Sequence, residues 1–228
     1  MPTKPVKMFT AWSFSRWKDH SSPTDGCPYR ARLKHLDKVA EGPKGPALIR
    51  GEQIHKLAEE YVKGTIEVIP TELALFKKEF ATLRKKKATP EGKWAVDAAW
   101  GPVDFFDWEH AWLRVVLDAH FKPTKATALV IDYKTGKIYG DNKDQMELYA
   151  IAGFAHYPEV DVVNTELWYL DQGEIKKETF SRGNVKTLKK KWLQKIIPLM
   201  TDRKFIPRPG DYCSRCAYSA RKNGPCKY

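Results

Sequence analysis

The sequence predicts an α/β domain built on a mixed β-sheet. Helical segments come first, three strand-like segments follow, and a further helix and strands come after them. Of the 228 residues, 42% are apolar and 30% are charged, which is ordinary for a globular chain that can bury a sizeable core. We therefore expect a single domain over residues 1–228, with its core at about residues 47–181.

The first half of the chain carries most of the helical signals. Helices are expected at residues 13–20, 27–36, 47–63 and 71–86. The third is the clearest, because Ile54, Leu57, Ala58 and Tyr61 recur at the spacing of one helical face, and Gly64 suits the position after a helix end. The Thr-Pro-Glu-Gly segment that follows the fourth helix, residues 89–92, is expected to be a turn.

Strand signals begin after that segment. Strands are expected at residues 93–100, 113–121, 128–133, 165–170 and 174–181. Residues 141–157 are expected to form a helix with Asp141 or Asn142 as its N-cap. An amphipathic helix at residues 185–200 completes the regular structure before Pro207 and Pro209.

The second and third expected strands are the most informative part of the chain. They flank a short connection, residues 122–127, and most simply form an antiparallel hairpin. Asp118 and Asp132 each lie seven residues from Lys125, the middle of that connection. In a symmetric hairpin their Cβ atoms would be roughly 5 Å apart. Because strand side chains alternate, Lys134 points to the side of Asp132 and Tyr133 to the opposite side.

Two carboxylates at such a distance raise each other's pKa or need a cation between them. Magnesium and manganese accept carboxylate oxygens, and such an ion polarises a phosphate and lowers the pKa of bound water. The arrangement of Asp118, Asp132 and Lys134 is therefore typical of metal-assisted phosphate chemistry. The alternative is a surface hairpin whose two carboxylates pair with Lys134, Lys122 or Arg114.

Three polar residues on the neighbouring helices are further candidates. His55 lies one residue off the apolar stripe of its helix, where it is either a packed or capping residue or an additional metal ligand. Gln145 and Tyr149 are four residues apart and share a helical face. Their amide and phenol can bind a phosphate, a base edge or a catalytic carboxylate. Alternatively, Tyr149 belongs to the core and Gln145 is exposed.

Positive charge is concentrated in the last fifth of the chain. Residues 182–228 contain thirteen Lys or Arg and two acidic residues, so they carry +11 of the net charge of +12. The usual partner of such a segment is nucleic acid, and the alternative is a solubilising tail. The sequence shows no apolar stretch of membrane-spanning length and no signal-peptide segment at its start. We therefore expect a cytoplasmic protein without a membrane partner.

The four cysteines, Cys27, Cys213, Cys216 and Cys226, are distributed between the two ends of the chain. Together they suit a tetrahedral zinc ion or a 4Fe–4S cluster that joins those ends. The basic, cysteine-bearing segment 182–228 would then pack against the N-terminal helices. The alternatives are two disulfides, which the cytoplasm disfavours, or a small zinc ribbon without Cys27 that a His or Asp completes.

Assembled in this order, the motifs resemble the PD-(D/E)XK nuclease superfamily. The resemblance is to its RecB-like exonuclease branch, which includes the CRISPR-associated adaptation nucleases and AddB-type proteins, and it runs over nearly the whole chain. The matching segments are Ser13–Ser15 and Cys27–Tyr29 (entry segment), Arg50–His55 (Gly-x-x-x-His), Asp118 (motif II acid), Asp132–Lys134 (Asp/Glu-x-Lys), Gln145–Tyr149 (Gln-x-x-x-Tyr) and the four cysteines.

The resemblance implies a restriction-endonuclease-like core, with a central mixed β-sheet flanked by helices and the chain ends joined by a cysteine metal site. It implies the following roles: Asp118, Asp132 and Lys134 catalytic; His55, Asp118, Asp132 and the Tyr133 carbonyl as ligands of Mg2+ or Mn2+; Gln145 and Tyr149 in DNA binding; Cys27, Cys213, Cys216 and Cys226 on a 4Fe–4S cluster, with Zn2+ as the alternative.

The implied function is a divalent-metal-dependent deoxyribonuclease, and more narrowly an exonuclease of DNA recombination, repair or processing. Its substrate would be single-stranded or end-containing DNA, in a bacterial cell or a virus-infected host cell, and it would belong to a virus or mobile element. The chain carries no helicase module, so a separate helicase or recombination protein is the expected partner. The alternative is a non-catalytic nucleic-acid-binding or CRISPR-interacting module with a structural cysteine metal site.

Overall fold

The computed structural model describes residues 7–138 and 142–228. The chain divides into two compact units, which are considered separately below. The larger unit spans Gly45–Lys189, and the smaller one combines the N-terminal part of the chain up to Lys44 with the part from Lys190 to the C-terminus.

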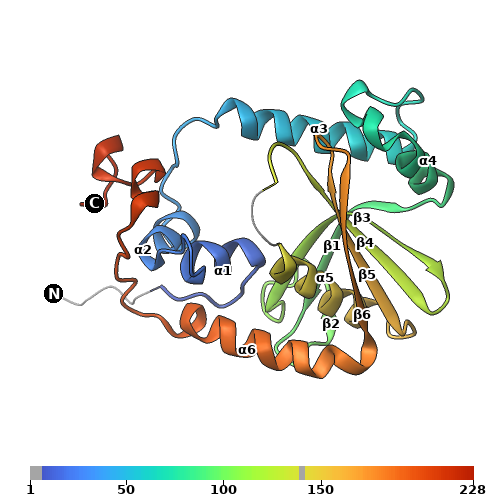
Figure 1. Cartoon of the computed structure of the whole chain (residues 1–228). Helices are drawn as coiled ribbons and strands as arrows, with labels where there is room; N and C mark the ends of the chain where they lie inside the picture. Colours follow the sequence, from blue (N-terminus) through green and yellow to red (C-terminus); the bar gives the residue numbers. More distant parts are fainter. Residues whose placement is uncertain (1–6, 139–141) are drawn as a thin grey trace. The chain divides into compact units, whose positions relative to one another are not determined.

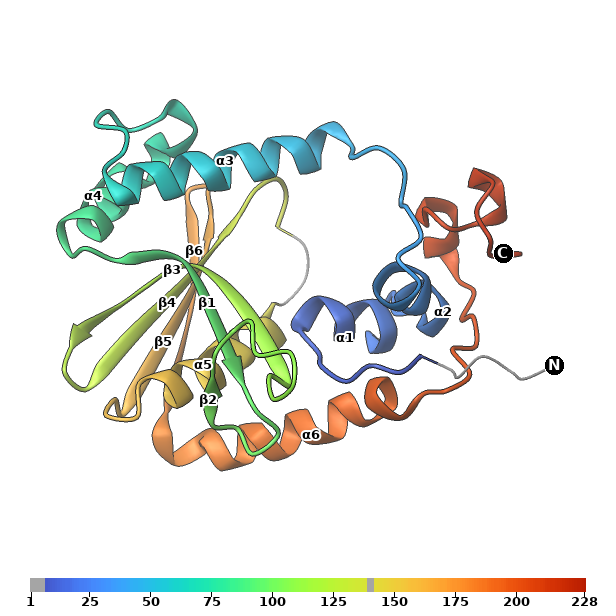
Figure 2. The same ribbon diagram turned by 180° about the vertical axis from the view of Figure 1, so that it is seen from behind.

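A six-stranded mixed sheet forms the centre of the larger unit (Figures 1 and 2). Its strands are β1 (Thr89–Val96), β2 (Pro102–Val103), β3 (Leu113–Thr124), β4 (Thr127–Lys134), β5 (Val162–Tyr169) and β6 (Glu174–Ser181), in the order β2-β1-β3-β4-β5-β6. All neighbouring strands are antiparallel except β4 and β5, which are parallel. The parallel pair needs a crossover, and the helix between the two strands supplies it. The prediction of a mixed sheet flanked by helices is confirmed.

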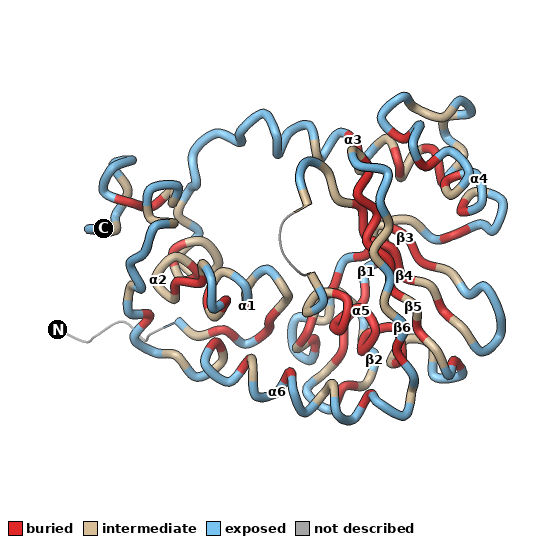
Figure 3. The backbone as a smooth tube through the Cα atoms, in the orientation of Figure 1, coloured by how far each residue is buried: buried red, intermediate tan, exposed pale blue. Residues whose placement is uncertain are grey.

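Helices pack against both faces of this sheet. The helical segments of the larger unit are α3 (Pro46–Lys63), η2 (Thr71–Phe76), α4 (Lys77–Lys85), α5 (Lys143–His156) and η3 (Arg182–Asn184). One face carries α5, and the other carries an apolar cluster that joins α3 and α4 to β3, β4 and β5. Figure 3 shows the buried stretches in the strands and in α5, whereas the N-terminal half of α3 is exposed.

Two local predictions were wrong. Residues 89–92 are not a turn, because β1 already begins at Thr89. β2 pairs only with Ala95 and Val96, at the other end of β1, so β1 has a neighbour on one side only at Pro90. Proline is tolerated at such an edge position because no ladder hydrogen bond is needed on the open side. The loop expected at residues 122–127 is shorter, since β3 continues to Thr124 and β4 starts at Thr127, with a register shift between Phe121 and Thr124.

The helix boundaries follow the expectations more closely. Gly64 adopts the left-handed conformation (φ 82°) that ends α3, as predicted. The segment expected at residues 71–86 divides into the 3₁₀ helix η2 and the α-helix α4. At the start of α5, Asn142 makes no side-chain capping bond, and the other expected N-cap, Asp141, lies outside the described residues.

The smaller unit is helical and aromatic-rich. It contains α1 (Phe14–Ser21), α2 (Pro28–Ala31), the π-helix η1 (Arg32–Leu36), the part of α6 (Val185–Thr201) from Lys190 onward, η4 (Asp211–Arg215) and η5 (Ala220–Lys222). Trp12 stacks on Trp192 with ring centroids 5.7 Å apart, and Trp17 meets Trp192 edge-on at 5.1 Å. The N-terminal residues and α6 therefore share one core, although they are far apart in the sequence.

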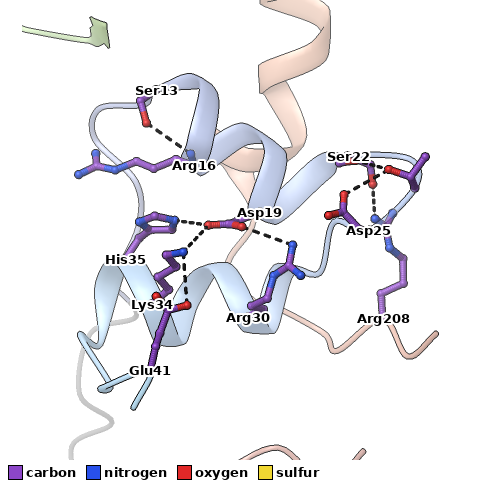
Figure 4. A network of polar contacts seen from close by, with 11 residues as sticks. Ser13, Arg16, Asp19, Ser22, Asp25, Arg30, Lys34, His35, Glu41 and Arg208 are labelled. Carbon is purple, nitrogen blue, oxygen red and sulfur yellow. Dashed lines mark hydrogen bonds and ion pairs between the residues drawn. The ribbon is translucent and has the colours of Figure 1, made fainter. Parts of the chain in front are cut away.

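A charged network between α1 and the following helices reinforces this unit (Figure 4). The carboxylate of Asp19 accepts from His35 Nε2 at 2.8 Å and lies 3.4 Å from Arg30 and 3.5 Å from Lys34. Burial opposes the charged form of Asp19, yet the His35 hydrogen bond and the charges of Lys34 and Arg30 outweigh it and lower the pKa of this carboxyl.

Candidate active site

The site forms where β3 and β4 separate. The two strands pair Ala119 with Ile131 and His120 with Val130, which is the register expected for a hairpin that places Asp118 opposite Asp132. Next to the Ala119 pair, the Asp118 carboxylate accepts the backbone N–H of Tyr133 at 2.5 Å. A side chain has thus replaced a backbone carbonyl as the partner of β4 at this point.

Asp118 also binds the helix that crosses this end of the sheet. Its second carboxylate oxygen is 2.9 Å from Nδ1 of His55 on α3. Gly51 of the Gly-x-x-x-His motif permits the close approach of α3, because a Cβ there would lie 3.1 Å from Thr135 Oγ1. The backbone of Arg50 is part of the same turn, and its guanidinium forms two bonds of 2.7 and 2.8 Å with Asp171.

The pKa values of this pair reflect burial and charge. Burial and the nearby charge of Asp132 raise the pKa of Asp118, although the contacts with His55 and the Tyr133 N–H partly oppose the change. For His55, burial works against the charged form, but the hydrogen bond to Asp118 and the two carboxylate charges outweigh it and raise its pKa. The pair therefore competes for protons as one unit.

Asp132 lies in a second, tightly connected group. Its carboxylate accepts from Tyr149 Oη at 2.5 Å and from Gln145 Nε2 at 3.1 Å, and its other oxygen is 2.6 Å from Lys134 Nζ. Lys134 in turn donates to Gln145 Oε1 at 3.0 Å. Burial and the charge of Asp132 raise the pKa of Tyr149, so the phenol stays a hydrogen-bond donor.

The alternation expected along β4 is present. Lys134 contacts Asp132 on the side of α5, whereas the ring of Tyr133 is buried in the cluster with α3 and α4. That ring meets His55 edge-on with centroids 5.8 Å apart. Gln145 and Tyr149 both donate to the Asp132 carboxylate. Of the partners expected for their amide and phenol, the catalytic carboxylate is therefore the one they contact. The contact of these two residues with DNA stays a prediction.

The sequence reasoning missed a third carboxylate beside this site. An open cleft of about 590 Å³ is lined by His55, Lys134 and Tyr133 and also by Glu52, Glu59 and Glu91. Glu91 is held in the left-handed region (φ 51°) on β1, and burial together with the charges of Asp118 and Glu59 raises its pKa. Interpreting residues 89–92 as a turn hid this residue, because only the strand pairing brings it toward Asp118.

The carboxylates of Asp118 and Asp132, together with His55 of the neighbouring cleft, have the chemistry of a magnesium or manganese site, but they do not form one as they stand. In the described part of the chain, no three His, Cys, Asp or Glu side chains are arranged to hold a metal ion. One buried Asp132 oxygen accepts no hydrogen bond from the described residues and has only the ion pair with Lys134. Hard carboxylate oxygens and one imidazole are donors that Mg2+ and Mn2+ accept. The donor types therefore fit such an ion.

The four cysteines come together in the smaller unit. All of them line one small cavity of about 20 Å³, between α2 and the C-terminal segment. All four are free thiols. Burial raises the pKa of Cys216, and Cys27 and Cys213 add to this effect. The cavity has room for about one water-sized group, and, over residues 7–138 and 142–228, the thiols form no ready metal site.

Comparisons with known proteins support the same class. Residues 113–221 match the family model described as the PD-(D/E)XK nuclease superfamily. No protein in the curated set matches the chain. The match to the family model covers β3, β4 and α5. It therefore includes the site residues Asp118, Asp132, Lys134, Gln145 and Tyr149. Together with the six-stranded mixed sheet, it supports a nuclease domain of the PD-(D/E)XK superfamily.

Solved structures share the fold over almost the whole chain. A protein from Eubacterium rectale described as a "putative exonuclease" is similar, with a TM-score of 0.55 and 14% identity over 96% of this chain and 90% of the other. The protein SSO0001 is similar, with a TM-score of 0.50 and 15% identity over 98% of this chain and 90% of the other. At such identities the likeness concerns the fold.

Among the described residues, no helix is long and apolar enough to span a membrane.

Proposed function

We propose that the chain is a divalent-metal-dependent deoxyribonuclease that acts as an exonuclease. The observation that carries the proposal is the buried Asp132 carboxylate, which is held between Lys134, Gln145 and Tyr149 beside the His55–Asp118 pair. A structural ion pair does not need three fixed partners around one carboxylate, whereas a site that must hold a carboxylate in one orientation does.

Asp118, Asp132, His55 and the Tyr133 carbonyl would hold Mg2+ or Mn2+. Such an ion supplies charge for the scissile phosphate and lowers the pKa of a water. Tyr149 and Gln145 keep one Asp132 oxygen occupied and leave the other oriented toward Lys134. Tyr133 N–H and His55 fix both oxygens of Asp118 in the same way.

Lys134 would orient the attacking water and offset negative charge as the phosphodiester bond breaks. Its ammonium is already placed by Asp132 and by Gln145 Oε1, so little ordering is needed when a phosphate arrives. Gln145 and Tyr149 would also position the DNA, and the basic C-terminal segment, residues 182–228, would follow its phosphate backbone. We place the activity in DNA recombination, repair or processing, for a virus or mobile element, with a separate helicase or recombination protein as partner.

We further propose that Cys27, Cys213, Cys216 and Cys226 hold a structural metal centre that joins the chain ends. The shared cavity supports this proposal. A 4Fe–4S cluster is the centre expected from the family pattern, and its insertion would require the thiols to move apart from a cavity of about 20 Å³. A zinc ion needs less space. Iron, sulfide and zinc analysis of purified protein separates the two.

The enzyme proposal is tested with end-labelled single- and double-stranded DNA, with and without Mn2+. We expect metal-dependent shortening from the ends by the wild-type chain and a loss of about 10³-fold or more in Asp132→Asn. The matched control is Asp161→Asn, because Asp161 is an exposed aspartate of the same unit. Binding without degradation by the wild-type chain would favour the non-catalytic module, and cleavage by Asp132→Asn would reject the assigned site.

A further inference from the structure

Two aromatic side chains of the larger unit stand in solvent on a loop that the proposed chemistry does not use. The loop connects β2 to β3, and it presents Phe106 at 56% and Trp108 at 76% exposure. Two exposed aromatic rings close together on one loop are typical of a surface that contacts a partner. Both lie in the same unit as Asp118.

This loop is held in a defined shape. Arg114 of β3 donates to the carbonyls of Phe105 and Asp107, both at 2.8 Å. Asp104 accepts the N–H of Phe106 at 2.7 Å, and Asp107 accepts the N–H groups of Glu109 and His110 at 3.0 and 2.9 Å. The rings are thus displayed on an ordered loop, and the carboxylates of Asp104 and Asp107 are turned into its backbone.

Cations accompany both rings. The guanidinium of Arg114 lies 4.6 Å from the ring centroid of Trp108, and the ammonium of Lys93 lies 5.4 Å from that of Phe106. Lys93 is exposed on β1 and pairs directly with Val116 of β3. An aromatic face next to a cation is the combination with which proteins bind the bases and the backbone of single-stranded nucleic acid.

The loop and the Asp118 carboxylate share one face of the sheet. Trp94 of β1 stacks on His156 at the end of α5 and therefore faces α5. Val115 of β3 is paired with Trp94, so Val115 faces α5 too. By strand alternation Arg114 and Val116 point to the opposite face, and Asp118 contacts His55 of α3 on that face. Val116, between the other two, is 46% exposed.

The spacing along β3 links the two features. At about 3.3 Å per residue, Arg114 lies roughly 13 Å from Asp118 along the strand. This is about four base steps of roughly 3.4 Å each. A strand that reaches Asp118 with one phosphate can therefore reach Trp108 with a base a few nucleotides away.

We propose that Phe106 and Trp108 form a stacking platform for the unpaired bases of a nucleic-acid strand whose backbone reaches Asp118. The inference rests on the proposed nuclease function and adds that single-stranded segments are the form bound beside the site. The loop between β2 and β3 carries Asp104, Asp107 and Glu109, whose negative charges disfavour phosphates next to the rings. The bases therefore contact the loop, and the phosphates lie toward Lys93. Duplex bases are already stacked on each other and gain little from the platform.

The test measures binding without cleavage. Anisotropy of labelled oligothymidylate and of a duplex of equal length is recorded in EDTA for the full chain, Trp108→Ala, Phe106→Ala and Trp108→Tyr. We expect about tenfold weaker single-strand binding in Trp108→Ala and a smaller loss in Phe106→Ala. Trp108→Tyr retains most of the affinity, and duplex binding changes less than about twofold. Leu75→Ala is the control, because Leu75 is exposed (65%) elsewhere in this unit.

Salt dependence separates stacking from charge. Trp108→Ala keeps the slope of affinity against salt, whereas Lys93→Gln reduces it by about one. Equal single-strand affinity of Trp108→Ala and wild type, or equal losses on single strand and duplex, would overturn the platform. Self-association that Trp108→Ala abolishes, with unchanged oligonucleotide affinity, would overturn it too and assign the rings to a protein contact. Absence of cleavage in the separate nuclease assay would reject the enzyme proposal and leave this result unaffected.

Discussion

The two groups of predicted ligands are organised very differently. In the larger unit, Asp132 has three side-chain partners within 3.1 Å, and Asp118 has two partners within 2.9 Å. In the smaller unit, the contacts of the thiols include two long bonds of 3.4 Å, from the backbone N–H groups of Arg208 to Cys27 and of Gly210 to Cys213. The carboxylates are held from several elements, whereas the thiols mainly share a cavity.

The difference follows from the chemistry of the groups. A buried carboxylate is costly unless it is paired and hydrogen-bonded, so a fold that buries Asp118 and Asp132 must also supply His55, Lys134 and Tyr149. A neutral thiol packs like a small apolar group and needs no partner. Burial keeps the pKa of Cys216 raised, so its thiolate forms only with a compensating cation. The carboxylate site is thus organised by the fold, and the cysteine site depends more on what binds there.

The largest expected effect concerns Lys134. Lys134→Met removes the ammonium beside Asp132, and we expect cleavage of labelled DNA, compared per folded molecule, to fall by about 10³-fold. The Tm should also fall, because the buried Asp132 carboxylate loses the cation that pairs with it. Lys137→Met is the matched control, because Lys137 is exposed three residues along the chain. Similar losses in both variants would show that the assay reports general charge rather than the site.

A cysteine variant tests the other side of the comparison. Cys216→Ser should abolish the bound iron or zinc measured by elemental analysis and lower the Tm by about 5 °C, since a metal stabilises the fold that holds it. Cleavage per folded molecule should fall less than tenfold. Ser214→Ala, in the short helix η4 that ends just before Cys216, should keep the metal. Equal metal content in the wild type and Cys216→Ser would exclude a cysteine centre.

Tyr149→Phe sharpens the role of the helix α5. The variant loses only the hydroxyl that donates to Asp132 at 2.5 Å. Because Lys134 and Gln145 still hold the carboxylate, we expect kcat to fall about tenfold with little change in KM. A direct DNA contact would instead raise KM, so steady-state kinetics on one oligonucleotide separate the two roles.

The smallest effect concerns the Asp19 network. Asp19→Asn should cost about 1–2 kcal/mol of stability at pH 7, because it removes a charge held by His35, Lys34 and Arg30. The folded pKa of Asp19 is lowered, so the unfolded chain, with a pKa of about 3.9, binds its proton first as the pH falls. The contribution of Asp19 to the free energy of unfolding is therefore complete above about pH 3.9, and it disappears as the pH falls through the pKa of Asp19 in the folded protein.

Denaturant unfolding of wild type and Asp19→Asn, at neutral pH and at several values below about pH 4, measures this dependence. The stability difference between the two proteins should narrow on acidification. Asp25→Asn, a neighbouring aspartate that lies in Figure 4 outside the Asp19 group, serves as the reference. A difference that widens at low pH would contradict the lowered pKa.

Much of the fold was predictable from local patterns. The apolar stripe of α3 with Gly64 at its end, the strand β6 and the hairpin register around Lys125 followed from periodicity and symmetry. Predictions failed where the environment overrides a local signal. The Thr-Pro-Glu-Gly segment contains two turn-forming residues, yet it pairs with β3 because Pro90 sits where β1 has no partner on its other side.

The sequence alone determined which side chains the protein possesses for phosphate chemistry, because the spacing around Lys125 and the alternation along β4 place Asp118, Asp132 and Lys134 without further information. Tertiary structure alone decided their partners: His55 meets Asp118, Glu91 enters the cleft, and the ends of the chain bring four cysteines to one cavity. The physical reason is that periodicity records only near neighbours, whereas the pairing of buried charges and the packing of distant segments depend on the whole folded chain.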